Sequence, residues 1–111
     1  MKHVKTLHLV LKSKWFDMIA SGEKTEENRE TKKNWLKRIL GISTPSLPVL
    51  TLKARQKSKQ PKFERVCFHR GNTNRTMIFV IKEVSVGIGK ALWGAPVDKE
   101  VIIIKLGSKI Q

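Results

Sequence analysis

The chain has 111 residues and a mass of 12.7 kDa, so we predict a single domain over residues 1–111. Lysine and arginine number 23 against 9 acidic residues, and the net charge of +14 favours an anionic partner, nucleic acid first. Because the apolar runs are too short to span a membrane and a single cysteine excludes an internal disulfide framework, we expect a cytoplasmic protein without a membrane partner.

The first 40 residues predict one strand and two helices. Apolar and polar residues alternate over His3–Lys12, which is the period of a half-buried strand. Ser13–Ala20 predicts a short amphipathic helix that ends at Gly22. Residues 24–30 contain no large apolar side chain, which is unusual for a structural strand. A second helix is predicted over Lys32–Leu40, and its polar face carries Lys33, Lys37 and Arg38.

Residues 42–62 predict a long basic connector that contains three prolines. Its most basic part holds Lys53, Arg55, Lys57 and Lys59, which would line one edge of an extended chain. One interpretation is contact with phosphates, which would make affinity fall steeply with salt. The alternative is a solvated loop without a partner.

The remaining chain predicts strands over Phe63–His69, Arg75–Val86 and Val101–Leu106, with turns at residues 71–72, 87–89 and 94–96. Both faces of Met77–Ile81 are apolar, as in a strand within a small barrel that a helix covers. We therefore predict an α+β fold, a small mixed β-barrel with two N-terminal flanking helices.

Cys67 and His69 would share one face of a strand and could begin a metal site. Structural zinc takes four ligands and catalytic zinc three, and neither His3 nor His8 stands at a recognisable spacing from this pair. The sequence thus favours a core cysteine beside a surface histidine, and we predict no metal and no cofactor.

Charged groups gather directly after the first helix, at Lys24, Glu27 and Arg29. In an extended chain Glu27 and Arg29 share a face, and Lys24 at the preceding turn can lean over them. These residues could form a recognition site, and the alternative is an exposed edge of salt bridges.

The same residues carry a resemblance to a known family. The pattern Gly22-x-Lys24-x-x-Glu27-x-Arg29 after the helix at 14–19, together with residues 35–38, 66–71, 87–96 and 102–107, resembles the ASCH domain of the PUA-like superfamily. It is most similar to the small stand-alone ASCH proteins of bacteria and phages. The resemblance implies a PUA-like barrel with an RNA-binding cleft lined by Lys24, Glu27 and Arg29.

The resemblance also implies an enzymatic alternative. Some ASCH proteins are amidohydrolases that act on acetylated cytidine through a lysine and a threonine three residues later, and nuclease activity also occurs in the family. Lys24 matches that lysine, whereas Glu27 stands at the threonine position. If the chain is an enzyme, Lys24 and Glu27 are the catalytic candidates for hydrolysis of a modified nucleoside or of RNA.

We predict that the chain binds RNA, single-stranded or looped, because a narrow cleft accepts a splayed base. The cleft residues Lys24, Glu27 and Arg29 would recognise a nucleotide. Phosphates would be held by cations of the second helix and the connector: Lys33, Lys37, Arg38, Lys53, Arg55, Lys57 and Lys59. Whether the chain is an enzyme stays open, and a protein-interaction module is a third possibility.

Overall fold

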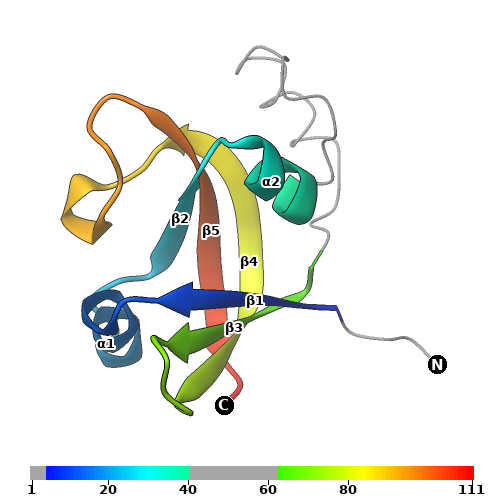
Figure 1. Ribbon diagram of the computed structural model, residues 1–111, viewed down its shortest axis with the longest axis vertical. Helices are drawn as coiled ribbons and strands as arrows, with labels where there is room; N and C mark the ends of the chain where they lie inside the picture. Colours follow the sequence, from blue (N-terminus) through cyan, green and yellow to red (C-terminus); the bar gives the residue numbers. More distant parts are fainter. Residues whose placement is uncertain (1–4, 41–62) are drawn as a thin grey trace.

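The computed structural model describes residues 5–40 and 63–111, apart from the side chain of Lys33. Its five strands form one sheet in the order β1-β3-β4-β5-β2 (Figure 1). β1 and β3 are parallel, and every other neighbouring pair is antiparallel. The α+β class with a mixed sheet and two helices is therefore confirmed.

The chain begins with the predicted strand and helix. β1, Thr6–Leu11, places Leu7, Leu9 and Leu11 in the core, as their alternation requires. α1, Ser13–Ser21, buries Phe16 and Ile19 against the sheet. Gly22 follows it at a φ of +88°, a left-handed conformation that glycine adopts without a steric cost, so the helix ends there.

The polar segment after α1 forms a strand, although its composition is unusual for one. β2, Glu26–Glu30, pairs along its whole length with β5, Glu100–Lys109. It forms because the backbone hydrogen bonds to β5 require no apolar side chains, and β2 is an edge strand with one open side. Pairing with β5 thus holds this strand in the sheet without apolar side chains.

The second helix spans almost the predicted range. A short α-helical turn, α2, Lys33–Trp35, continues as the π-helical segment η1, Leu36–Leu40, which buries Leu36 and Ile39. No helix within residues 5–40 and 63–111 is long and apolar enough to cross a membrane.

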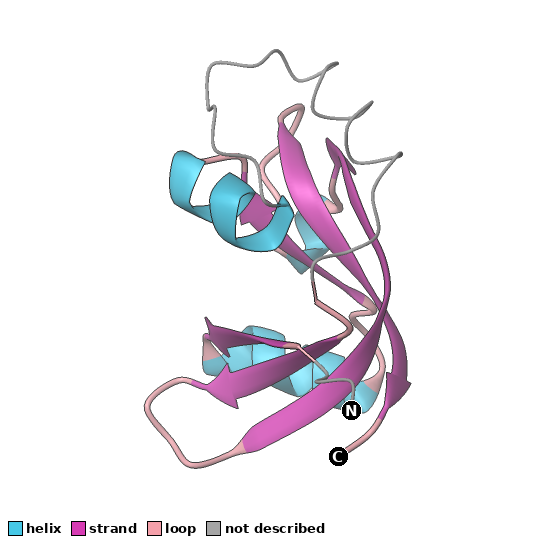
Figure 2. Ribbon diagram, turned by 90° about the vertical axis from the view of Figure 1, so that its right-hand side faces the viewer, coloured by secondary structure: helices cyan, strands magenta, loops and turns pink. Residues whose placement is uncertain are grey.

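The long strand β4, Thr76–Ile88, gives the sheet its curvature. It pairs with β3, Arg65–Arg70, along its first half and with β5 along its second. Its register with β5 shifts twice between Phe79 and Glu83, and such bulges bend a strand and increase its twist. The sheet consequently curls into a half-barrel, with α1 and α2 towards opposite ends (Figure 2). The turn expected at 87–89 begins later, because Gly87 and Ile88 still belong to β4.

The core lies on both sides of β5 rather than on both sides of β4. In β5 the four residues Val101–Ile104 are all buried. Ile102 and Ile104 face the main core, while Val101 and Ile103 pack in a second cluster with Ala95. Along β4 burial alternates, and Val80 is 38% exposed, so the expectation of two buried faces at 77–81 was wrong.

Candidate functional site

The half-barrel leaves a cleft of about 1270 Å³ that is lined by residues of both edge strands, β1 and β2. All three tryptophans of the chain line it: Trp15 from α1, Trp35 from α2 and Trp93 from the short 3-10 helix η2, Ala91–Trp93. Glu27 and Arg29 belong to the same wall. Aromatic and charged side chains from distant parts of the sequence are thus brought to one surface.

A buried ion cluster lies beneath this wall. Lys24 is 1% exposed and Glu27 is 4% exposed. The Lys24 Nζ lies 2.7 Å from Glu27 Oε1 and donates a second hydrogen bond to the carbonyl of Glu26. Arg29 pairs with the other oxygen, Glu27 Oε2. One carboxylate is therefore held between two cations, as a buried charge requires.

The backbone after α1 explains how Lys24 becomes buried. Gly22 turns the chain back, and the N–H of Lys24 donates to the carbonyl of Met18 at 3.0 Å. The side chain then points inward, and its ammonium lies 5.8 Å from the centre of the Trp15 ring. Lys24 holds Glu27 from behind and, unlike Glu27 and Arg29, is not part of the cleft wall. This placement differs from the expectation that all three residues line the cleft.

Arg29 links the two edge strands across the cleft. Its NH1 donates to the carbonyl of Asn28 at 3.1 Å, within β2. Its NH2 donates to the carbonyl of Val10 in β1 at 3.3 Å. Because β1 and β2 end the sheet on opposite sides, this guanidinium crosses the opening of the half-barrel. A bulky ligand in the cleft would meet Arg29 directly.

Each tryptophan of the cleft has a cation near its ring. The guanidinium carbons of Arg29 and Arg38 lie 5.2 and 5.5 Å from the ring centre of Trp35. Lys14 Nζ lies 4.7 Å from that of Trp15, and Lys90 Nζ lies 4.3 Å from that of Trp93. These distances fall within the range of cation–π attraction. Arg29 and Arg38 also line the cleft, which therefore offers positive charge next to the aromatic surface of Trp35.

The other predicted cations are placed differently. Arg38 lines the cleft, and its NH2 donates to the carbonyl of His8 at 2.7 Å. Lys37 is exposed and is not part of the wall. The side chain of Lys33 lies outside the described part of the structure, as do the connector at 42–62 and its residues Lys53, Arg55, Lys57 and Lys59.

Sequence reasoning missed two further cations of the wall, Lys12 and Lys99. Lys12 follows β1 directly, and Lys99 precedes β5. The one available signal was their position at the ends of predicted strands. That signal cannot place them in a cleft, because it says nothing about which strand ends meet.

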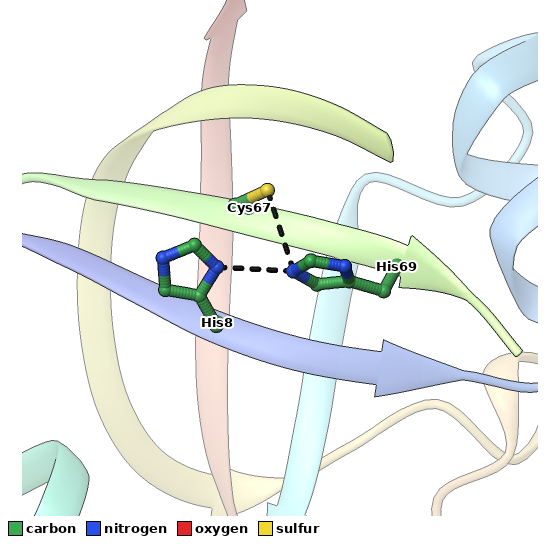
Figure 3. Close-up of side chains that lie close together, drawn as sticks. All are labelled: His8, Cys67 and His69. Carbon is green, nitrogen blue, oxygen red and sulfur yellow. Dashed lines mark hydrogen bonds between the residues drawn. The ribbon is translucent and has the colours of Figure 1, made fainter. Parts of the chain in front are cut away.

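The structure also brings together His8, Cys67 and His69 in a cluster that the sequence did not predict (Figure 3). His8 Nδ1 lies 3.0 Å from His69 Nε2, and that nitrogen lies 3.7 Å from Cys67 Sγ. Burial raises the pKa of the Cys67 thiol above its ordinary 9.0, since the thiolate loses hydration there. Cys67 and His69 were noted as a pair, and the parallel pairing of β1 with β3 adds His8.

No family model, no curated protein and no solved structure matches this chain. The resemblance to the ASCH domain stays a prediction.

Proposed function

We propose that this chain is an RNA-binding protein that takes a single-stranded or looped segment into the cleft between β1 and β2. The observation that carries the proposal is the convergence of Trp15, Trp35 and Trp93 on one cleft that also holds Arg29 and Arg38. Unpaired bases stack on aromatic rings and on guanidinium planes, and phosphates are attracted by the cations beside them. The net charge of +14 would add a long-range attraction to the RNA backbone.

The polar groups of the cleft wall support recognition of a base. Glu27 can only accept hydrogen bonds, and its carboxylate is held in one orientation by Lys24 and Arg29. The amide of Asn28 offers donors and an acceptor in the same wall, and its Nδ2 lies 3.4 Å from the carbonyl of Trp93. A fixed acceptor beside an adjustable amide suits the edge of a nucleobase. An ASCH-type, PUA-like cleft would have this role.

The geometry of Lys24 favours binding over hydrolysis. A lysine that acts as a nucleophile must reach the substrate with a free amine. The ammonium of Lys24 is buried, donates to the carbonyl of Glu26 and is paired with Glu27. Lys24 is therefore proposed as a positioning residue for Glu27, and hydrolysis of a modified nucleoside or of RNA stays the alternative.

The test is a titration of the protein with labelled single-stranded RNA at several salt concentrations, followed by tryptophan fluorescence. We expect quenching, because bases would stack in a cleft that holds every tryptophan of the chain. Trp93→Ala should weaken binding about tenfold, while Trp93→Phe should keep most of the affinity, since a ring remains. Arg38→Ala should lower the salt slope by about 1.

Lys82→Ala is the matched control for charge, because Lys82 is exposed on β4 and is not part of the cleft wall. A second variant neutralises Lys53, Arg55, Lys57 and Lys59. It measures how much the predicted connector contributes to the affinity for RNA. Equal effects of Trp93→Ala and Lys82→Ala, or no binding at low salt, would contradict the cleft as the RNA site. Gels run in parallel reveal cleavage, which would favour the hydrolase alternative.

A further inference from the structure

The cluster of His8, Cys67 and His69 arises from the pairing of two strands. In β3, Cys67 and His69 are two residues apart and so point to one face of the sheet. β1 is parallel to β3, with His8 opposite Cys67 in the register. Neighbouring strands lie about 4.8 Å apart, so side chains in register on one face come into contact. Three donor groups from residues 8, 67 and 69 thus meet at one point (Figure 3).

Two separations between donor atoms of the cluster are close to those of ligands around a tetrahedral zinc ion. With zinc–nitrogen bonds of about 2.05 Å and a zinc–sulfur bond of about 2.3 Å, the ligand atoms stand about 3.3 Å apart for two nitrogens and about 3.6 Å apart for nitrogen and sulfur. The observed separations are 3.0 Å between the two histidine nitrogens and 3.7 Å between His69 Nε2 and Cys67 Sγ. All three donor atoms lie within 4.8 Å of one another.

We propose that His8 Nδ1, Cys67 Sγ and His69 Nε2 bind a zinc ion whose fourth position faces the RNA-binding cleft. Two imidazoles and a thiolate are ligands that zinc prefers, whereas magnesium and calcium take oxygen ligands. Three protein ligands leave one position for water or another small ligand. His8 and His69 are both part of the cleft wall, so that position lies on the open side of the cluster, while Cys67 is buried behind it.

Without metal, a hydrogen bond between the two rings explains the short distance between the histidines. One ring nitrogen then carries the hydrogen and the other accepts it. Zinc needs both nitrogens free of hydrogen, so the donating ring changes to its other tautomer, and the thiol of Cys67 releases its proton to solvent. The two arrangements differ by about 0.3 Å in the separation of the nitrogens, 3.0 Å against about 3.3 Å, which small rotations of the exposed His8 ring can supply.

The test titrates the reduced full chain with Zn²⁺ in competition with a chelating dye, and with Co²⁺ as a spectroscopic substitute. We expect one ion per chain, tetrahedral visible bands for cobalt and a thiolate-to-cobalt charge-transfer band. No RNA is present, so the result is independent of the proposed function. Failure of the reduced chain to bind Zn²⁺, or a cobalt complex without thiolate charge transfer, would overturn the proposal.

Variants separate this site from adventitious binding. His8→Ala should weaken zinc binding by more than about tenfold, because it removes one of three ligands. His8 is exposed, so this variant should fold, and circular dichroism checks that it does. Cys67→Ser should abolish the charge-transfer band. Val10→Ala is the matched control, since Val10 is opposite His69 in the register, is 63% exposed and has no ligating atom.

The open fourth position has its own test. Azide added to the cobalt complex should shift the visible bands, because it replaces the solvent ligand at that position. Zinc binding by His8→Ala and Cys67→Ser that equals binding by the wild type would show that the metal is elsewhere and would overturn the site. Visible bands that azide leaves unchanged would overturn the open position.

Discussion

The buried ion cluster and the outer corner of the sheet each hold a carboxylate paired with arginine, in very different surroundings. In the buried ion cluster of Lys24, Glu27 and Arg29, the carboxylate is 4% exposed. At the outer corner, Arg70 at the end of β3 forms two parallel hydrogen bonds of 3.0 Å to Asp17 of α1. The side chain of Asp17 is 53% exposed.

The comparison teaches that burial, and not the geometry of the ion pair, decides how much a charged side chain contributes to the stability of the fold. The outer corner has the forked geometry that suits arginine and carboxylate, yet water competes with it and solvates either partner alone. In the buried ion cluster Lys24 and Glu27 are shielded from water, so removing Lys24 leaves the buried carboxylate with less compensation. We therefore expect the buried ion cluster to be essential for stability and for the shape of the cleft, and the corner to be dispensable.

The largest effect is expected for Lys24→Met. This change leaves the carboxylate of Glu27 buried with one cation, and we expect the free energy of unfolding to fall by about 3 kcal/mol, as measured by urea denaturation. Arg70→Met is the matched variant at the outer corner and should move the urea midpoint little.

The double variant Lys24→Met/Glu27→Leu shows whether the buried carboxylate, left with Arg29 alone, is the cause. The double variant removes the buried carboxylate together with Lys24 and leaves Arg29, whose side chain is 17% exposed and can be hydrated. It should therefore be more stable than Lys24→Met alone. If Lys24→Met and Arg70→Met were equally stable, the contrast between the two regions would be disproved.

A smaller effect is expected from substitutions of two glycines that line the cleft, Gly94 and Gly71. Gly94 has a φ of +90°, and an added Cβ would lie 2.9 Å from Cζ2 of Trp15 in the cleft. Gly94→Ala should therefore lower the free energy of unfolding by about 2 kcal/mol, through backbone strain and displacement of the ring.

Gly71, beside the outer corner, is the matched control, because its φ is +52° and an added Cβ would meet open space. Gly71→Ala should cost about 1 kcal/mol from the backbone alone. Urea denaturation measures both variants, and a larger cost at Gly71 than at Gly94 would refute the role of the contact with Trp15.

The smallest effect is expected for Asp17→Asn. The hydrogen bond from Arg70 holds the pKa of Asp17 below its ordinary 3.8. A pKa that is lower in the folded than in the unfolded chain stabilises the fold above the unfolded value, and this contribution is lost as the pH falls through the folded value. Wild type and Asp17→Asn should thus differ slightly in urea midpoint at about pH 7 and converge in acid, as the pH falls from 3.8 through the lower pKa of the folded chain. A difference that grows in acid would contradict this assignment.

Local patterns predicted much of the fold. The alternation of Leu7, Leu9 and Leu11 identified β1, and Gly22 marked the end of α1, because both signals depend on the spacing of neighbouring residues. The polar strand β2 was missed, since an edge strand is stabilised by backbone hydrogen bonds to a distant partner. The pattern at 77–81 was misread because its apolar residues do not show which face meets solvent.

The candidate site was also predicted only in part, because the sequence shows the spacing of neighbouring residues but not their distant contacts. Glu27 and Arg29 were expected in the cleft and line it. They share one face because they are two positions apart in an extended chain. Lys24 was expected beside them, but the turn at Gly22 directs its side chain into the interior. The spacing of Cys67 and His69 indicated two possible ligands, and no local signal pointed to His8.

By itself the sequence determined the charge of the chain, its α+β class and the short-range spacing of its chemical groups, because these properties depend on residue type and on neighbours. Only the tertiary structure decided which groups meet. The parallel pairing of β1 with β3 brings His8 to Cys67 and His69, and the curl of the sheet gathers the three tryptophans in one cleft. Such contacts join residues far apart along the chain and follow from strand pairing and burial, which no local pattern encodes.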